Sequence, residues 1–221
     1  GPGDDLVIFE VGPTVEDVEV SIAADDGPWQ NLGRVDAATG LIDLQDGCAF
    51  RPLGESRAWC WQTGCMMQWL GPDFDRHVIY NDLRDGAFVS VVVDVGTGAE
   101  RVLPRAVLAV SLDGTKAACV NMSRLDIMRP GYGYPGPEYG GIEDPAPDDD
   151  GAWLMELDTG ESTLVASCAR VAAAEATPDM AGKHHWLNHL EFNPSATRFT
   201  MIHRWSDVPV GGQRASAWGN Q

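Results

Sequence analysis

The chain has 221 residues, of which 44% are hydrophobic, and its 33 acidic residues outnumber 15 Lys and Arg, for a formal net charge of −18. This charge opposes binding to nucleic acid and to anionic membranes, because the phosphate-neutralising term would be repulsive. No stretch reaches the roughly 18 apolar residues of a membrane span, and the first residues lack the basic and apolar regions of a secretion signal. We therefore expect a soluble, globular protein of the cytoplasm or periplasm.

One sequence pattern occurs three times along the chain. Each copy has an alternating apolar run, an acidic residue, a Thr-Gly pair shortly after it, and a second apolar run. The copies are RVDAATGLIDL from Arg34, VVDVGTGAERVL from Val92 and LMELDTGESTLV from Leu154. Asp36, Asp94 and Glu156 head the predicted turns, and Gly40, Gly98 and Gly160 supply positive φ. The pattern predicts three β-hairpins.

A second kind of turn alternates with the first. It occurs in LAVSLDGTKAACV from Leu108, in HLEFNPSATRFTMI from His189 and, more loosely, in MMQWLGPDFDRHVIYND from Met66. Two linked hairpins make a unit of four antiparallel strands, which is the blade of a β-propeller. We predict an all-β chain in which residues 1–221 form a single propeller domain or a fragment of one, incomplete or open, with about four blades. Open blade edges would favour a homo-oligomer.

The strands can be placed approximately. The first complete blade is expected at Met66–Trp69, His77–Asn81, Phe88–Asp94 and Ala99–Leu103, and the next at Val107–Ser111, Ala117–Asn121, Ala152–Glu156 and Ser162–Ala166. An earlier half-blade includes Leu32–Val35 and Leu41–Leu44, and a later blade begins at Asn188–Phe192 and Arg198–His203. Residues 122–151 form a long loop insertion, and the alanine-rich Ser167–Glu175 is expected to be a short helix.

The segment Lys183–Trp205 holds four of the five histidines. Strand alternation would place His185, Leu187, His189 and Glu191 on one face. His185, His189 and His203 are then candidate ligands of one divalent metal such as Mn, Zn or Fe. Alternatively, His189 is a base that removes a proton α to a carboxylate neutralised by Arg204. A third interpretation has the histidines hydrogen-bonding strand ends, with Trp186 and Trp205 in the core. Asn188 is a separate candidate for contact with a substrate.

The insertion contains a second candidate site in MSRLDIMRPGYGYPGPEYGG from Met122. Arg124 and Arg129 can pair with a carboxylate, and Tyr132 and Tyr134 can stack on sugar rings. The alternative is a loop that packs over the blades with its tyrosines as anchors. The acidic Glu143–Asp150 can bind Ca²⁺ or be a solvated loop.

A third candidate is WCWQTGCMMQW from Trp59. Gln62 is an additional candidate ligand contact, and Trp59, Trp61 and Trp69 either stack on sugar or belong to the core. The sequence has no P-loop, no G-x-G-x-x-G after a strand and no G-x-S-x-G elbow, so nucleotide binding and serine hydrolysis lack a motif.

The hairpin repeats, the run HxxNHLxFNPxxxRFxxxHRW and the RPGYGYPG segment resemble the TolB-like and oligogalacturonate-lyase-like bacterial β-propeller proteins over about residues 60 to 205. The lyase resemblance implies a seven-bladed ring, a divalent metal held by histidines and a glutamine, and β-elimination of a uronate-containing saccharide. We therefore form two hypotheses. One is a lyase acting on acidic saccharides, with His189, Arg129 and Arg204 in catalysis; the other is a non-catalytic propeller that binds a glycan or protein partner.

Overall fold

The computed structural model describes residues 6–10, 37–44, 47–135, 142–174, 176–207 and 219–220. These residues form four antiparallel sheets with two short α-helices and one 3₁₀ turn. The all-β prediction is confirmed.

The two central sheets have four strands each, as predicted. The first contains β4 (Gln68–Leu70), β5 (His77–Arg84), β6 (Ala87–Asp94) and β7 (Glu100–Leu103). The second contains β8 (Ala109–Val110), β9 (Lys116–Cys119), β10 (Gly151–Glu156) and β11 (Ser162–Ser167). Gly98 and Gly160 have φ of 73° and 76°, and their N–H groups donate to Asp94 and Glu156 carbonyls at 2.8 Å. The two Thr-Gly turns predicted in this region are therefore confirmed.

The two outer sheets have three described strands each. They are β1 (Leu6–Glu10), β2 (Ala37–Asp43) and β3 (Ala49–Ser56), and β12 (His184–Phe192), β13 (Phe199–Ser206) and β14 (Gly219–Asn220). The first Thr-Gly prediction was wrong, because Thr39 and Gly40 lie inside β2 with a register shift between them. A Cβ on Gly40 would lie 2.3 Å from the Phe50 ring, so this glycine permits close packing between strands instead of a turn. The predicted strand Leu32–Val35 lies outside the described residues.

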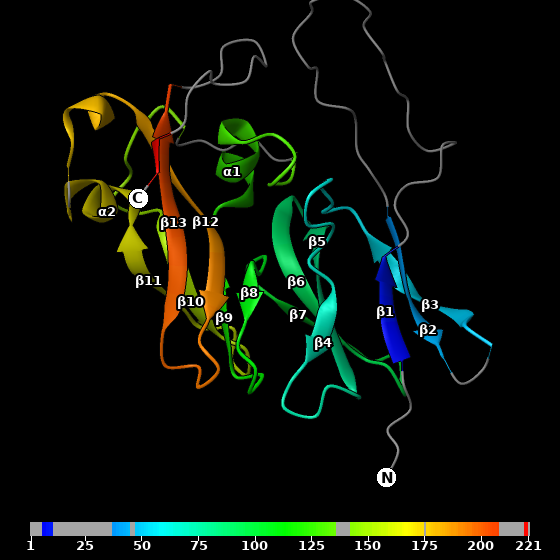
Figure 1. Ribbon diagram of the computed structural model, residues 1–221. Coiled ribbons are helices and arrows are strands. Elements are labelled where there is room, and N and C mark those ends of the chain that lie inside the picture. Colours follow the sequence, from blue (N-terminus) through cyan, green and yellow to red (C-terminus); the bar gives the residue numbers. More distant parts are fainter. Residues whose placement is uncertain are drawn as a thin grey trace, which may run out of the picture.

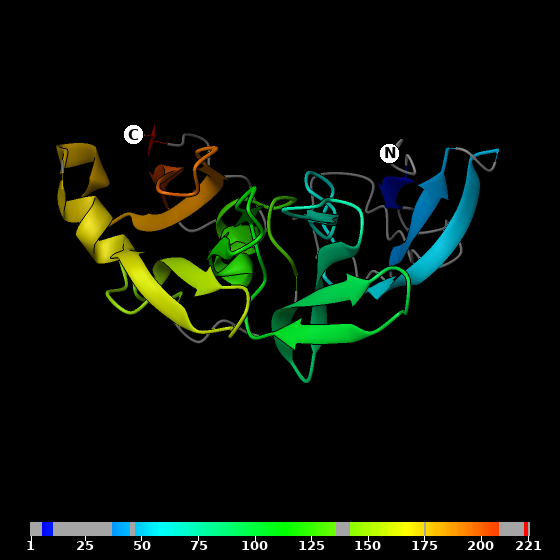
Figure 2. The same cartoon turned by 90° about the horizontal axis from the view of Figure 1, so that it is seen from below.

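The sheets follow one another along an arc in chain order (Figures 1 and 2). Each sheet is a run of consecutive antiparallel strands, and each passes to the next through one connection. This is the blade-by-blade arrangement of a propeller. Within the described residues the arc is open.

The apolar core lies between successive sheets. Leu70, Ile79 and Val92 of one central sheet pack in the same cluster as Cys119 and Met155 of the next. A second cluster fills the space between the second central sheet, the helix inserted between β9 and β10, and β12. The alternating apolar positions of each strand therefore serve to join blades as well as to build them.

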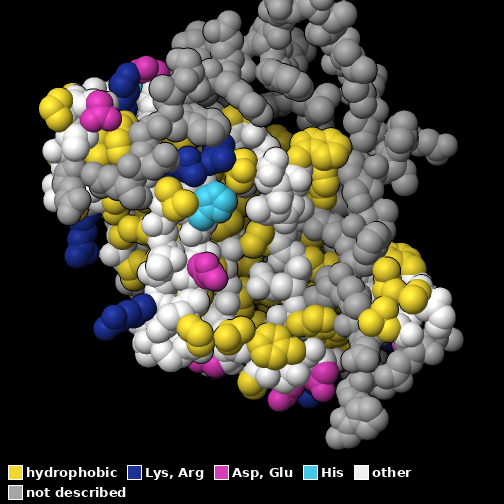
Figure 3. All heavy atoms as spheres, viewed as in Figure 1, with side chains coloured by type: hydrophobic (Ala, Val, Ile, Leu, Met, Phe, Trp, Pro, Cys, Tyr) yellow, Lys and Arg dark blue, Asp and Glu magenta, His cyan; other side chains and the backbone are white. Residues whose placement is uncertain are grey.

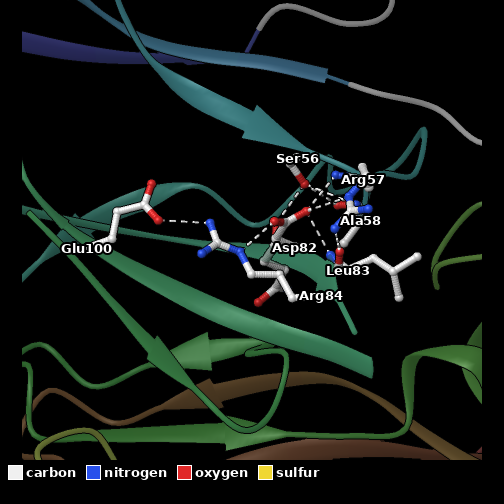
Figure 4. Close-up of polar contacts among 8 residues, drawn as sticks. Ser56, Arg57, Ala58, Asp82, Leu83, Arg84 and Glu100 are labelled. Carbon is white, nitrogen blue, oxygen red and sulfur yellow. Dashed lines mark hydrogen bonds and ion pairs between the residues drawn. The ribbon is translucent and has the colours of Figure 1, made fainter. Parts of the chain in front are cut away.

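A polar junction joins the end of β3 to β5 (Figure 4). Asp82 is only 5% exposed. Its side chain accepts hydrogen bonds from the N–H groups of Arg57 at 2.9 Å and Leu83 at 2.8 Å. It also accepts one from Arg84 Nε at 2.9 Å, and Arg84 Nη2 reaches Glu100 at 3.0 Å. A buried carboxylate is tolerated here because several donors replace its hydration.

The insertion begins with a helix, α1 (Met122–Met128), where the sequence predicted only a loop. The Asn121 side chain caps its N-terminus by accepting the Arg124 N–H at 2.9 Å. Met122, Leu125 and Met128 form its buried face, which adds apolar burial to a short helix that would not be stable alone. The short helix predicted at Ser167–Glu175 is present as α2 (Cys168–Ala174) and is followed by a 3₁₀ turn (Pro178–Met180).

Candidate functional site

A β-bulge interrupts β12 in the histidine segment. Leu187 pairs with His203 and Asn188 with Ile202, but the register then shifts before Glu191. His189 lies in the bulge with φ of 50°, a left-handed conformation that is uncommon for a side chain other than Gly, Asn, Asp or His. The extra residue ends the strict alternation. His189 is consequently exposed, whereas His185 is 4% exposed.

His185 and His203 form a buried pair. The Nδ1 of His185 lies 2.8 Å from the Nε2 of His203, and the two rings stack with centroids 5.0 Å apart. One nitrogen must donate and the other accept. Burial first, and then the charge of a protonated His203, lower the pKa of His185 to about 4. This pair is an interior hydrogen bond between two imidazoles.

The predicted metal trio is not brought together as a ligand set. Among the described residues, no group of three or more His, Cys, Asp or Glu side chains is placed to hold a metal ion. The physical reason is the bulge, which takes the His189 ring to Tyr132, 5.7 Å between centroids, while His185 packs on His203. In the described part of the chain, His185, His189 and His203 therefore do not form the ligand set that the lyase resemblance implies.

Arg124 lies inside the fold and not in a ligand site. Arg124 is only 2% exposed. Its Nε donates to the His185 carbonyl at 2.7 Å. Its Nη2 donates to the carbonyls of Asp144 at 3.1 Å and Pro145 at 2.9 Å. The guanidinium fastens the end of the insertion to β12. The prediction that Arg124 binds substrate does not match this placement.

Tyr134 is likewise interior, with no exposed surface. Its hydroxyl oxygen accepts a hydrogen bond from Asn81 Nδ2 at 2.9 Å. Asn81 also accepts from the Val107 N–H and from Ser90 Oγ, so the tyrosine completes a buried polar network between two sheets. It anchors the insertion, which was the alternative interpretation from sequence.

Three basic side chains from separate segments converge at the surface beside α1, and we call Arg129, His189 and Arg204 the basic cluster. The Arg129 guanidinium lies 4.0 Å over the Tyr132 ring, and that ring contacts His189 edge-on. Figure 3 shows a histidine next to Lys or Arg side chains on this face, near the positions of β12 and α1 in Figure 1. These contacts bring Arg129 and His189 together around Tyr132, and Arg204 is near enough to act electrostatically on His189.

Asn188 orients one member of the basic cluster. It is buried, and its Oδ1 accepts a hydrogen bond from Arg204 Nε at 3.2 Å. Its Nδ2 is buried with no hydrogen-bond partner in the part of the chain that the structure describes. Asn188 and Tyr132 are therefore positioning residues, each holding one arginine.

The charges in the basic cluster act on one another. Partial burial lowers the pKa of His189, and the positive charges of Arg129 and Arg204 lower it further. Burial and then Arg129 lower the pKa of Arg204 as well. The imidazole is thus favoured in its neutral form beside two guanidinium groups. Such a group can accept a proton or a hydrogen bond near neutral pH.

The local backbone explains how Arg129 and Tyr132 reach this position. The helix ends at Met128, and its C-cap residue Arg129 precedes Pro130, which disfavours helical conformation in the residue before it. The following loop then folds tightly over the helix. A Cβ on Gly133 would lie 2.2 Å from the backbone of Asp126 and Met122, so only glycine allows this approach.

The third candidate segment meets the same loop. The Gln62 N–H donates to the Gly131 carbonyl at 3.1 Å, and the Gln62 side chain is exposed. Gln62 therefore lies close to the loop that carries Arg129 and Tyr132. Trp61 beside it is 68% exposed, so it does not belong to the core.

The chain is similar to the TolB protein seen in the crystal structure of TolB from Acinetobacter baumannii. The two chains share 14% sequence identity with a TM-score of 0.41. The match covers 81% of this chain and 37% of the TolB chain. The sequence matches no family model and no curated protein. Among the described helices, none is sufficiently long and apolar to cross a bilayer.

Proposed function

We propose that this protein binds a saccharide that bears a carboxylate, of the uronate type, at the basic cluster. The observation that carries the proposal is the convergence of Arg129, Arg204 and His189 around Tyr132, in a protein of net charge −18. Like charges held together raise the free energy of the site, and a bound anion offsets that cost. The cluster also supplies a local positive potential to an otherwise acidic molecule.

The two arginines suit a carboxylate because a guanidinium presents donors in a fork that matches its oxygens. Tyr132 and Asn188 restrict the arginines by a cation–π contact and a hydrogen bond. Restricting them before the ligand arrives reduces the entropy lost on binding. His189, neutral and exposed, can accept a hydrogen bond from a sugar hydroxyl.

A second candidate function is β-elimination on the same ligand, and the lowered pKa of His189 favours it. An arginine that neutralises the carboxylate makes the proton on the adjacent carbon more acidic. His189 would take that proton. The electron pair forms a carbon–carbon double bond, the glycosidic carbon–oxygen bond breaks, and the leaving oxygen takes a proton from water. The product is an unsaturated uronate that absorbs ultraviolet light.

Calorimetric titration with a uronate trisaccharide tests the binding proposal. Arg204→Gln should weaken binding about 10- to 100-fold, which corresponds to one charge-assisted hydrogen bond of about 1.5–3 kcal/mol. The matched control is Arg198→Gln, which removes the same charge from an exposed residue next to β13. Inorganic sulfate and a neutral trisaccharide separate general anion binding and general sugar binding from recognition of a uronate.

The proposal is wrong if the wild-type protein does not bind the uronate trisaccharide, or if Arg198→Gln weakens binding as much as Arg204→Gln. Elimination is tested on the same samples by ultraviolet absorbance. His189→Gln should stop product formation while the trisaccharide affinity stays within a few-fold of the wild type. Absence of product from wild-type protein that binds the trisaccharide would reject the lyase and keep the binding function.

A further inference from the structure

An exposed tryptophan lies on a loop that is hydrogen-bonded to the loop carrying Arg129 and Tyr132. Trp61 is 68% exposed and belongs to the connection between β3 and β4. Its neighbour Gln62 donates its N–H to the Gly131 carbonyl at 3.1 Å, and Gly131 is next to Tyr132. This backbone hydrogen bond therefore joins the loop that carries Trp61 to the loop that carries Tyr132.

The loop tip that carries Trp61 is firmly held. Cys60 and Gly64 exchange two backbone hydrogen bonds, at 3.3 and 2.9 Å, which close the tip around Trp61. Cys60 and Cys65 on either side are buried. The Trp59 ring contacts the Trp61 ring edge-on, with centroids 4.8 Å apart and planes at 78°. This geometry is a favourable aromatic pair, and it fixes the indole while leaving most of it in contact with solvent.

The two loops also share one apolar cluster. Cys60 of the first loop is a buried member of it, and Tyr132 of the second packs against it. The surface formed by the two loops is therefore fixed by both a hydrogen bond and common packing. A rigid surface of this kind binds a ligand with little loss of conformational entropy.

We infer that Trp61 forms a second, apolar subsite, and that the ligand is an oligosaccharide of at least two sugar residues. This inference rests on the proposed function. The carboxylate of one sugar binds at the basic cluster, and the neighbouring sugar stacks its apolar face on the indole. A flat aromatic face buries the C–H side of a pyranose ring and leaves its hydroxyl groups solvated. Trp61 thereby sets a preference for a chain over a single sugar or a small anion.

The test compares a uronate monosaccharide with a uronate trisaccharide by calorimetry. In wild-type protein the trisaccharide should bind more tightly than the monosaccharide. Trp61→Ala should reduce the trisaccharide affinity about 5- to 10-fold and leave the monosaccharide affinity unchanged. Trp61→Phe should restore most of the loss, because phenylalanine keeps a flat apolar face. Phe74→Ala is the matched control, since Phe74 is also an exposed aromatic residue but lies at the other end of β4.

The outcomes separate this inference from the proposed function. If wild-type protein binds neither sugar, both are overturned. If Arg204→Gln weakens trisaccharide binding but Trp61→Ala does not, the second subsite is overturned and the binding function stands. If Trp61→Ala weakens both sugars equally, or if Phe74→Ala has the same effect, a separate subsite at Trp61 is also rejected.

Discussion

Acidification should destabilise this fold through His185. Burial, followed by the charge of a protonated His203, lowers the pKa of His185 to about 4, against about 6.5 in an unfolded chain. The folded state then binds fewer protons than the unfolded state between these two values. The free energy of unfolding therefore falls as the pH falls. Above about pH 6.5 the imidazole is neutral in both states and its full contribution is present.

The size of this effect follows from the shift. A difference of about 2.5 pKa units corresponds to about 3 kcal/mol, of which about 2.5 kcal/mol is lost by about pH 4.5. Asp126 acts in the opposite direction, because burial raises the pKa of its carboxyl to about 6. Its folded form gains protons first and is stabilised as the pH falls through the same range. Because these two effects oppose each other, the pH dependence of the wild-type unfolding free energy does not isolate the contribution of His185.

The informative comparison is with the double variant His185→Gln/His203→Gln. It removes both imidazoles of the buried pair but retains Asp126, whose contribution cancels in the difference. Urea unfolding, followed by tryptophan fluorescence, is measured at about pH 7.5 and about pH 4.5. The wild-type protein should lose about 2.5 kcal/mol more than the variant between these conditions. Equal losses would refute the assignment of a neutral, buried His185.

Two further substitutions test residues that the structure moves from ligand binding to the interior. Arg124→Met should lower the free energy of unfolding by about 3 kcal/mol in urea titration, because three carbonyls lose a charged donor. A loss of less than about 1 kcal/mol would contradict the structural role of Arg124. Tyr134→Phe should lower it by about 1 kcal/mol, because Asn81 Nδ2 loses an acceptor. The same variant should leave trisaccharide affinity unchanged in calorimetry, and a weakened affinity would return Tyr134 to the site.

Local sequence determined most of the strands. Alternating apolar residues around the Asp94 and Glu156 turns specify hairpins with few long-range requirements, since a strand has period two and a glycine at positive φ closes the turn. The same Thr-Gly pattern failed at Thr39–Gly40. There the strand continues, because Gly40 is needed to accommodate the Phe50 ring of the partner strand. A turn motif indicates only a local conformational preference, and tertiary packing can override it by placing the same glycine inside a strand.

In the candidate site too, local sequence indicated some features and tertiary packing decided others. Sequence indicated the reactive segments, since Arg129, Tyr132, His189 and Arg204 are concentrated in an unusual loop and an unusual hairpin. It also suggested Arg124, Tyr134, His185 and His203, which the fold buries. The surface residues and the buried residues are of the same types (Arg, Tyr and His), so composition and spacing alone cannot predict which of them are buried.

Two tertiary features made that separation. The bulge in β12 turns His189 away from the His185–His203 pair and to the Tyr132 ring. The end of α1, with the close passage of Gly133, places Arg129 where it acts on Arg204. Both depend on contacts between segments far apart in the chain. The sequence by itself therefore determined the strands and the supply of reactive groups, whereas only packing between blades decided which groups share a surface, because burial and electrostatic coupling are properties of distance in space.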